Sequence, residues 1–473
     1  MSHRTLLIYL GNKKNIGIFI FLFTAIHLHV EAQPATGTSS QTIIKNLDEY
    51  LTSAAEHYKF NGSVLVAKKG NVLLHKGYGF KDALRKIFND SNTIFQICSI
   101  TKQFTAAVIL KLQEEGKLSV EDKLSKYFPA YKYGDKITLV NLLTHTSGIY
   151  NYTNDIDEDD SAIVCNPVSK QRVLDAFNNK PLDFNPGTKF SYGNSNYYLL
   201  GLIIEKVTGR PYEDVLRETI FTPLTMNHSG FDFRNLKDTF KATGYKVLNE
   251  NNMVIAQRWD STVTYAAGAV YSTTADMYRW AQAVAKKEII SGDSWQQAFT
   301  PHLDNYGYGW WIDSLYGKIY VTHSGGMPGF MSNIIYYPQE DVTIILLNNE
   351  GNYGESLLPL NRAVSAIVFS LPYNNWETHM AIKVDEKILR QYVGVYAMDD
   401  KPTLFITLKK GQLYAKGNSA KSIPKLPIYA ESDNRFYLQN FNVTFTLIKN
   451  PDGQIIKIVC HENGKDIDMK KIE

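Results

Sequence analysis

A serine and a lysine stand at the head of an apolar run in the stretch Ser99-Ile100-Thr101-Lys102-Gln103-Phe104-Thr105-Ala106-Ala107-Val108-Ile109-Leu110-Lys111-Leu112. The stretch from Ala106 to Leu112 is apolar almost all round, and a helix of that kind is buried in the middle of a domain. Gly116 follows, and glycine commonly ends a helix. We therefore expect a buried central helix from about Ser99 to Glu115.

Two polar side chains stand at the start of this helix. Ser99 and Lys102 are three residues apart, so they share one face and the amine can take the hydroxyl proton. A hydroxyl at a helix N-terminus is favoured when it gains negative charge, and partial burial lowers the pKa of a lysine. The alternative is that Ser99 only caps the helix and Lys102 is exposed.

A second motif is Tyr192-Gly193-Asn194. A phenol beside a lysine can relay a proton between a nucleophile and a leaving group. The amide of Asn194, two residues on, can orient Lys102 or a substrate carbonyl. In a chain with 30 tyrosines, the triplet could also be an ordinary tyrosine-rich loop.

A third motif, His323-Ser324-Gly325-Gly326, stands at the end of an expected strand. Small residues there allow a substrate backbone to lie alongside the strand. The backbone N–H of Gly326 could join that of Ser99 in an oxyanion hole. His323 could bind a substrate carboxylate or tune Tyr192. A glycine turn before the next strand is the alternative.

The surrounding pattern predicts an α/β (α+β) domain with an antiparallel sheet that collects strands from both ends of the segment. Apolar spacing predicts helices over 42–58, 199–207 and 276–284. Short apolar runs predict strands over 63–67, 72–75, 319–322, 333–337 and 342–347.

The C-terminal part has a different texture. Short alternating runs separated by turn residues predict a small all-β barrel or sandwich over 385–473, joined by a linker at 372–384 to a first domain at 33–371. The strands expected there are 392–396, 404–408, 412–415, 436–438, 443–448 and 455–459.

The N-terminus has the pattern of a secretory signal. Lys13 and Lys14 precede an apolar run over 16–26, and Val30-Glu31-Ala32 offers a cleavage point. The run is shorter than the roughly 20 residues that span a membrane, which disfavours a membrane anchor. We expect a signal peptide over 1–32 and a secreted or periplasmic protein with no stable membrane insertion after cleavage.

Composition excludes other classes. A net charge of +3 over 473 residues, with no clustered basic stripe, disfavours a nucleic-acid partner. The three cysteines, Cys98, Cys165 and Cys460, form neither a disulfide framework nor a zinc-like spacing. We expect a small-molecule, peptide or ester substrate and neither a metal nor an organic cofactor.

With these motifs in order, residues 40–370 resemble the serine β-lactamase and penicillin-binding peptidase superfamily, specifically its class C β-lactamase-like branch. That branch includes D-alanyl-D-alanine carboxypeptidases, D-amino-acid peptidases and esterases. Residues 385–473 are similar to the small barrel-like domain, here taken as lipocalin-like, that often follows such hydrolases. The matching segments are 95–105, Leu142-Leu143-Thr144-His145-Thr146-Ser147-Gly148, 185–194, 205–209, Tyr306-Gly307-Tyr308-Gly309-Trp310-Trp311 and 323–326.

The resemblance implies the roles of the site residues. Ser99 would be the acylated nucleophile, Lys102 and Tyr192 the general base pair, and Asn194 the group that orients them. His323 falls where the family has lysine or histidine, and Ser324, Gly325 and Gly326 complete its substrate strand. The fold implied is an antiparallel sheet flanked by helices, plus an all-helical lobe.

The sequence departs from the family pattern at Cys98, where glycine or another small residue is usual, and at Thr225, where glycine is familiar. We expect crowding at the first position and an effect on packing at the second.

The function expected is a secreted serine acyl hydrolase that forms an acyl-enzyme on amide or ester bonds, with D-residue peptides or small esters as substrates. A class C β-lactamase is the alternative, disfavoured because a histidine at position 323 is mostly uncharged at neutral pH. A penicillin-binding sensor is the non-enzymatic alternative, disfavoured by the intact Ser99 and Lys102. No Gly-x-Ser-x-Gly segment supports an α/β-hydrolase.

Overall fold

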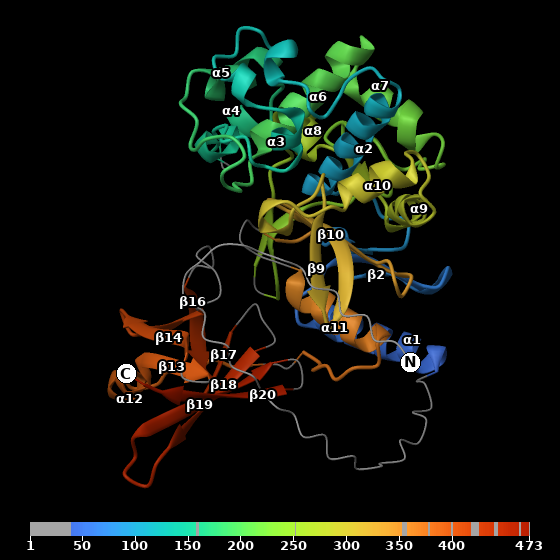
Figure 1. Cartoon of the computed structure of the whole chain (residues 1–473). Helices are drawn as coiled ribbons and strands as arrows, with labels where there is room; N and C mark the ends of the chain where they lie inside the picture. Colours follow the sequence, from blue (N-terminus) through green and yellow to red (C-terminus); the bar gives the residue numbers. More distant parts are fainter. Residues whose placement is uncertain are drawn as a thin grey trace, which may run out of the picture. The chain divides into compact units, whose positions relative to one another are not determined.

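The computed structural model describes residues 39–157, 160–250, 252–351, 357–376, 379–398, 401–417, 425–438, 443–462 and 465–472 (Figure 1). The predicted signal peptide, residues 1–32, lies outside the described residues. The α-helices are α1 Ser40–Glu56, α2 Thr101–Glu114, α3 Leu139–Leu143, α4 Ser161–Val164, α5 Lys170–Asn178, α6 Asn194–Thr208, α7 Tyr212–Leu216, α8 Ser261–Gly268, α9 Thr274–Ala285, α10 Gly292–Ala298, α11 Leu358–Val368 and α12 Glu386–Tyr392.

The strands fall into a first set before residue 350 and a second set after 393. The first set is β1 Gly62–Lys68, β2 Asn71–Tyr78, β3 Phe80–Asp82, β4 Ile87–Phe88, β5 Phe95–Gln96, β6 Tyr245–Leu248, β7 Met253–Ile255, β8 Tyr271–Ser272, β9 Trp311–Leu315, β10 Lys318–Met327, β11 Phe330–Tyr337 and β12 Val342–Asn348. The second set is β13 Gly394–Met398, β14 Lys401–Lys409, β15 Gln412–Gly417, β16 Leu426–Ala430, β17 Arg435–Leu438, β18 Val443–Lys449, β19 Ile455–Glu462 and β20 Lys465–Lys471.

The predicted antiparallel sheet is confirmed. Its six strands lie in the order β2-β1-β12-β11-β10-β9, so strands from the two ends of the segment meet at its centre. Val64 of β1 pairs with Leu346 of β12, and Leu65 pairs with Ile345. The strands β11 and β12 are buried along their whole length.

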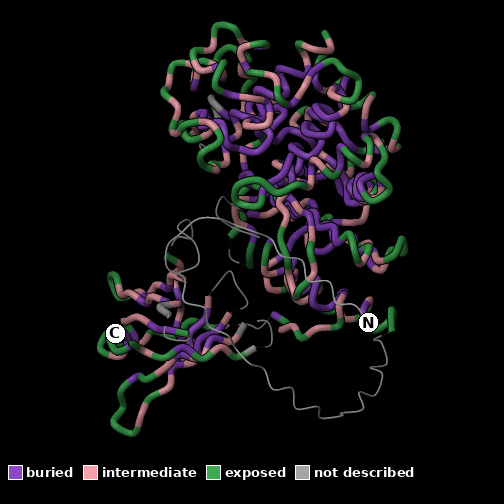
Figure 2. The backbone as a smooth tube through the Cα atoms, in the orientation of Figure 1, coloured by how far each residue is buried: buried purple, intermediate pink, exposed green. Residues whose placement is uncertain are grey.

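The two faces of the sheet have separate cores because side chains alternate along a strand. Val64 and Leu346 pack with α1 and α11. Leu65 and Ile345 pack in the other core, which α2 forms with further helices between α3 and α10; these helices are called the helical lobe. Figure 1 shows α1 and α11 beneath the sheet and the helical lobe above it. Figure 2 shows buried residues inside the lobe and around the sheet.

The central helix predicted from the apolar run is also confirmed. It begins as a short 3₁₀ turn, η1 Cys98–Ile100, continues as α2, and is followed by Gly116 with a φ of +68°. Its residues from Thr101 to Leu110 are all buried. Ser99 therefore stands on the η1 turn, just before the α-helix proper begins.

At both positions where the sequence departs from the family pattern, the backbone has a conformation that favours glycine. Cys98 has a φ of +50° and Thr225 a φ of +54°, in the left-handed region that favours glycine. A non-glycine residue there costs about 1–2 kcal/mol. The effect of Thr225 is therefore on backbone conformation, where an effect on packing was expected. The fully buried Cys98 stores strain directly before Ser99.

The C-terminal strands form the predicted barrel. Strands β13 to β20 follow one another as neighbours, and β20 pairs with β13, which closes the barrel. The prediction that residue 392 begins a strand is wrong, because Tyr392 ends the helix α12 and the strand begins at Gly394. Strands β16 and β20 were not predicted from the sequence pattern.

Three negative observations apply to the described part of the chain. Within it, no helix combines the length and the apolar character needed to cross a membrane. Over the same residues, no group of three His, Cys, Asp or Glu side chains is placed to hold a metal ion. The three cysteines, all described, are free thiols.

Candidate active site

The η1 turn, α6 and α8 bring three oxygen atoms to one buried amine. The Nζ atom of Lys102 lies 3.0 Å from Ser99 Oγ, 2.8 Å from Asn194 Oδ1 and 2.8 Å from the main-chain oxygen of Ala267. An amide oxygen and a carbonyl oxygen can only accept hydrogen bonds. When the Lys102 amine is neutral, the oxygens of Asn194 and Ala267 accept hydrogen bonds from its two N–H groups. Its lone pair is then turned toward the Ser99 hydroxyl.

The environment of Lys102 favours this neutral amine. The residue is fully buried on the first turn of α2. Burial penalises the ammonium form and holds the pKa of the Lys102 amine well below its ordinary value of 10.5. The arrangement can therefore accept a proton from a serine hydroxyl, as a general base requires.

The carbonyl of Ala267 is delivered by a bend inside α8. Tyr265 there has a φ of +42° and a ψ of −133°, which breaks the helix and turns the following carbonyls toward α2. The oxygen of Ala266 accepts a hydrogen bond from Thr105 Oγ1 at 2.7 Å. Successive carbonyls of one bent segment thus bind successive turns of α2.

Asn194 is oriented by its own partners. It begins α6, its main-chain N–H donates to Asn151 Oδ1 at 2.9 Å, and its Nδ2 donates to Thr153 Oγ1 at 3.1 Å. With Nδ2 so engaged, Oδ1 faces Lys102. The structure thereby brings the predicted partner Asn194 to the lysine.

Tyr192 lies against the same amine. The centroid of its partly buried ring is 4.8 Å from Lys102 Nζ. The ring also contacts His145, with centroids 4.3 Å apart, and His323, at 6.2 Å. The predicted residues Ser99, Lys102, Tyr192, Asn194 and His323 are therefore neighbours in the fold.

His323 is neutral, and both of its ring nitrogens are in use. Its Nδ1–H donates to the oxygen of Ser324 at 2.6 Å, and Nε2 accepts from the hydroxyl of Tyr306 at 2.9 Å. Burial is the main cause that lowers the pKa of His323, to about 3. A neutral ring has no charge to attract a substrate carboxylate, and the two roles expected of His323, binding a carboxylate and tuning Tyr192, stay predictions.

The small residues after His323 face opposite sides in alternation. Gly325 is buried, and a Cβ there would lie 2.3 Å from the oxygen of Ile97 and 2.9 Å from Cys98 Cβ. Ser324 and Gly326 are exposed, and a Cβ at Gly326 would meet no atom within 4 Å. Gly325 thus allows β10 to approach the nucleophile turn, and its place in the substrate strand stays a prediction.

The edge of β10 beside these residues is open. Its ladder with β9 ends at the pair Thr322–Trp311. From His323 to Met327 that edge has no strand partner among the described residues, since β11 occupies the other side. An extended substrate could add there as a further strand, with Gly326 facing open space.

Sequence reasoning missed several groups that hold the site. The carbonyl of Ala267 carries no side-chain signal, and Tyr306 was noted only as part of a motif. Gly309, from that same motif, packs over α2, where a Cβ would lie 2.8 Å from the oxygen of Lys102. The tyrosine-glycine spacing was the available signal for this contact.

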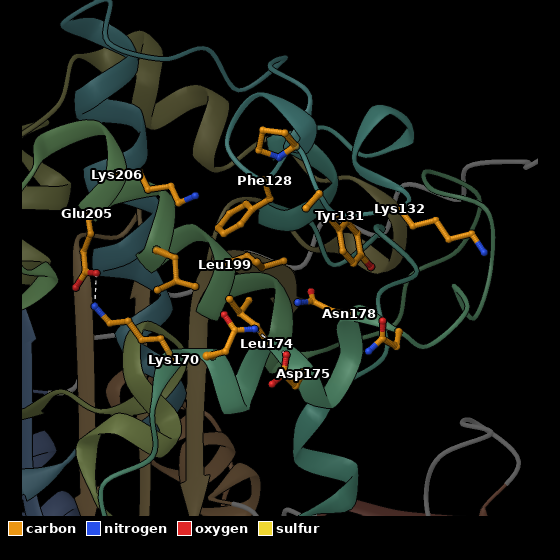
Figure 3. A pocket seen from close by; sticks show the side chains of 15 residues that line it. Phe128, Tyr131, Lys132, Lys170, Leu174, Asp175, Asn178, Leu199, Glu205 and Lys206 are labelled. Atoms are coloured by element: carbon orange, nitrogen blue, oxygen red, sulfur yellow. Dashed lines mark hydrogen bonds and ion pairs between the residues drawn. The ribbon is translucent and has the colours of Figure 1, made fainter.

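A large cavity lies elsewhere, at the far end of α6. Its volume is about 910 Å³, and Figure 3 shows its lining side chains. None of the residues around Ser99 lines it. The cavity is lined, among others, by Phe128, Tyr131, Lys170, Leu174, Glu205 and Lys206.

Comparison with known proteins shows the family to which the chain belongs. The sequence model of the β-lactamase family matches residues 46–368. The chain belongs to the β-lactamase family. It is a serine hydrolase of the β-lactamase and penicillin-binding protein superfamily, and residues 378–471 match a domain of unknown function (DUF3471).

The relatives include penicillin-binding protein 4* of Bacillus subtilis (strain 168), 32% identical over 448 residues, which are 89% of this chain and 97% of that protein. Among solved structures, a penicillin binding protein from Bacillus halodurans is 26% identical with a TM-score of 0.59, over 70% of this chain and 99% of that one. D-amino acid amidase from Ochrobactrum anthropi SV3 is 22% identical with a TM-score of 0.61, over 70% and 98%, and shows the shared fold.

Proposed function

We propose that Ser99 is the nucleophile of this hydrolase and that Lys102 is its general base. The observation that carries the proposal is the buried Lys102 amine, whose Nζ lies 3.0 Å from Ser99 Oγ and 2.8 Å from each of the oxygens of Asn194 and Ala267. An amine with this geometry and a lowered pKa is built to receive the serine proton.

The reaction then proceeds in two half-reactions. The Ser99 proton passes to Lys102 Nζ while Oγ attacks the substrate carbonyl, and the oxyanion is stabilised by the N–H groups of Ser99 and Gly326. Tyr192, beside Lys102, passes the proton on to the leaving amine or alcohol as the bond to the carbonyl carbon breaks. In the second half, water attacks the acyl-enzyme, its proton goes to the Tyr192–Lys102 pair, and Ser99 regains its hydrogen.

The substrates we propose are peptides with D-residues and small esters. Neutral His323 supplies no fixed positive charge of the kind that would bind the carboxylate of a β-lactam. The D-amino acid amidase that shares the fold acts, by its name, on D-amino acid amides. A β-lactam is expected to acylate Ser99 slowly, and a class C β-lactamase is the less favoured function.

We also propose that the protein is secreted, on the basis of the basic and apolar segments and the small residues before Gln33. Expression of the full chain with fractionation, followed by mass spectrometry of the exported protein, tests this. A mature N-terminus at Gln33 is expected. Recovery of the protein in the cytoplasm with its first 32 residues intact would contradict it.

Covalent labelling tests the nucleophile. A fluorescent penicillin and a fluorophosphonate probe should each label the protein at Ser99, as mapped by peptide mass spectrometry, and Ser99→Ala should abolish both. Ser191→Ala, which removes an exposed hydroxyl of the tyrosine loop, is the matched control and should label normally. Equal labelling of Ser99→Ala would overturn the assignment. Turnover of a chromogenic cephalosporin, D-Ala-D-Ala peptides, D-aminoacyl anilides and p-nitrophenyl esters then ranks the substrates.

A further inference from the structure

His145 is a buried histidine that the proposed reaction does not use. It stands two residues after α3, in the segment Leu142–Gly148, with no exposed surface and a φ of +55°. A left-handed histidine is uncommon, and strain of about 1–3 kcal/mol persists only where the surrounding structure requires it. Its contacts show what requires it here.

The backbone on both sides of Tyr192 is bound to this single residue. The N–H of Ser191 donates to the main-chain oxygen of His145 at 2.9 Å, and the N–H of Gly193 donates to its Nδ1 at 3.3 Å. Between these two bonds, the imidazole ring lies against the Tyr192 ring with centroids 4.3 Å apart and planes at 41°. The left-handed turn lets main chain and side chain of His145 face the same loop.

The protonation state of the ring is fixed as well. Nδ1 also receives a hydrogen bond from Nδ2 of Asn196 at 3.1 Å, and Oδ1 of that amide accepts from Ser147 Oγ at 2.5 Å. Two donors therefore point at Nδ1, so the neutral ring carries its proton on Nε2. Burial holds the pKa of His145 well below its ordinary value.

We propose that His145 is a positioning residue that sets the Tyr192 phenol against Lys102. The inference rests on the proposed role of Tyr192 as the proton relay. His145 touches no reacting atom. It fixes the two peptide groups that flank Tyr192 and one face of its ring, and a relay displaced by about 1 Å loses on the order of 100-fold in rate.

A double-mutant cycle separates this role from a contribution to the core alone. His145→Gly keeps the left-handed backbone while it removes the acceptor and the ring. His145→Asn also tolerates that backbone, and it restores an acceptor near the position of Nδ1. Tyr192→Phe removes only the phenol. The rate of Ser99 acylation by a fluorescent penicillin is measured for each single variant and for both histidine variants in the Tyr192→Phe background.

We expect Tyr192→Phe to slow acylation by about 100-fold or more. His145→Gly should slow it by about 100-fold in the protein with Tyr192 but by less than about threefold in the Tyr192→Phe background, because the loss acts through the phenol. His145→Asn should recover about tenfold of that loss. Equal losses in both backgrounds, or no recovery with asparagine, would overturn the positioning role.

The outcomes also separate this inference from the proposed function. If Tyr192→Phe acylates at the unaltered rate, the relay itself is wrong; if it is slow and the His145 losses multiply, only the positioning role falls. A measurement on the unmodified protein guards against a variant that fails to fold. The ¹⁵N NMR signals of His145 should show an unprotonated Nδ1 and a protonated Nε2 from pH 5 to 8. A protonated Nδ1 would contradict the hydrogen bonds that Nδ1 accepts from Gly193 and Asn196.

Discussion

The two ends of helix α6 differ in what they do with polar groups. At its N-terminal end, Asn194 binds the buried Lys102, and its amide oxygen and nitrogen each have a fixed partner. At its C-terminal end, Glu205 and Lys206 line an open cavity of about 910 Å³ (Figure 3). The eleven residue steps from Asn194 to Glu205 separate the two ends by roughly 16 Å along the helix.

The difference shows that cavity volume alone does not locate chemistry. Lys170 at the open end keeps half of its side chain exposed and is paired with Glu205. Lys102 has no exposed surface and three oxygen neighbours, and burial lowers its pKa. Desolvation in a preorganised set of acceptors, not space, makes an amine a base.

Removal of the Lys102 amine should have the largest effect. Lys102→Met fills a similar volume but cannot take the serine proton, and it leaves the oxygens of Asn194 and Ala267 without the N–H donors that now bind them. We expect the rate of Ser99 acylation by a fluorescent penicillin to fall about 1,000-fold or more. Near-UV circular dichroism serves as the control for packing. A loss below about tenfold in a folded variant would show that Lys102 is not the base.

A carboxylate at position 194 should change the pH dependence. In Asn194→Asp the negative charge favours the ammonium form of Lys102 and raises its pKa. Acylation should then begin at higher pH, with a loss of about 10- to 100-fold at neutral pH that base restores. Asn194→Leu is the comparison, because it removes the acceptor without adding charge. An unshifted pH profile for Asn194→Asp would argue against a titrating Lys102.

Acid should destabilise the folded protein through its buried histidines His323 and His145. The folded protein keeps His323 neutral down to a pH of about 3, whereas the unfolded chain binds the proton near 6.5. Stability is therefore full above about pH 6.5 and is lost toward pH 3, by about 1.4 kcal/mol per pH unit for this group. His145 acts in the same direction. Urea unfolding of His323→Gln should show a shallower loss between pH 6 and 4, and parallel curves for the two proteins would refute the assignment.

The smallest effect is expected at the open end. Lys170→Ala breaks an ion pair that is half exposed on the lysine side, and such pairs contribute about 0–1 kcal/mol to stability. The unfolding free energy should change by no more than that, and Ser99 acylation should stay within about twofold. Lys132→Ala, on the same cavity, is the companion variant. A tenfold change in acylation by either would couple the cavity to the site and remove the contrast between the two ends of α6.

Much of the fold followed from local pattern. The run Ala106–Leu112 predicted a buried helix because apolar residues covered every side, and the runs that became β1 and β12 are continuous enough to be central strands. Closure of the barrel could not be predicted in this way. Strand β20 is mostly charged, and its Ile467 and Met469 pack in the barrel core. Its pairing with β13 joins segments that are distant in the sequence.

The site divides along the same line. Side chains at fixed spacing, such as Ser99 and Lys102, could be found because their residue types themselves indicate the chemistry. The acceptor from Ala267 is a main-chain atom, aimed by a left-handed Tyr265 that no composition rule favours. His145 was identified as part of a family segment. Its hydrogen bonds to Ser191 and Gly193, however, depend on a backbone turn that cannot be predicted from the sequence.

The pairing of β1 with β12 has a consequence for biosynthesis. Asn61 and Asn348, hydrogen-bonded at the edge of this pair, are 287 residues apart. At translation rates of 5–20 residues per second, the apolar β1 leaves the ribosome roughly 15 to 60 seconds before its partner strand exists. Until then one edge of β1 in the β1–β2 hairpin has no partner strand, so the central sheet can form only late in synthesis.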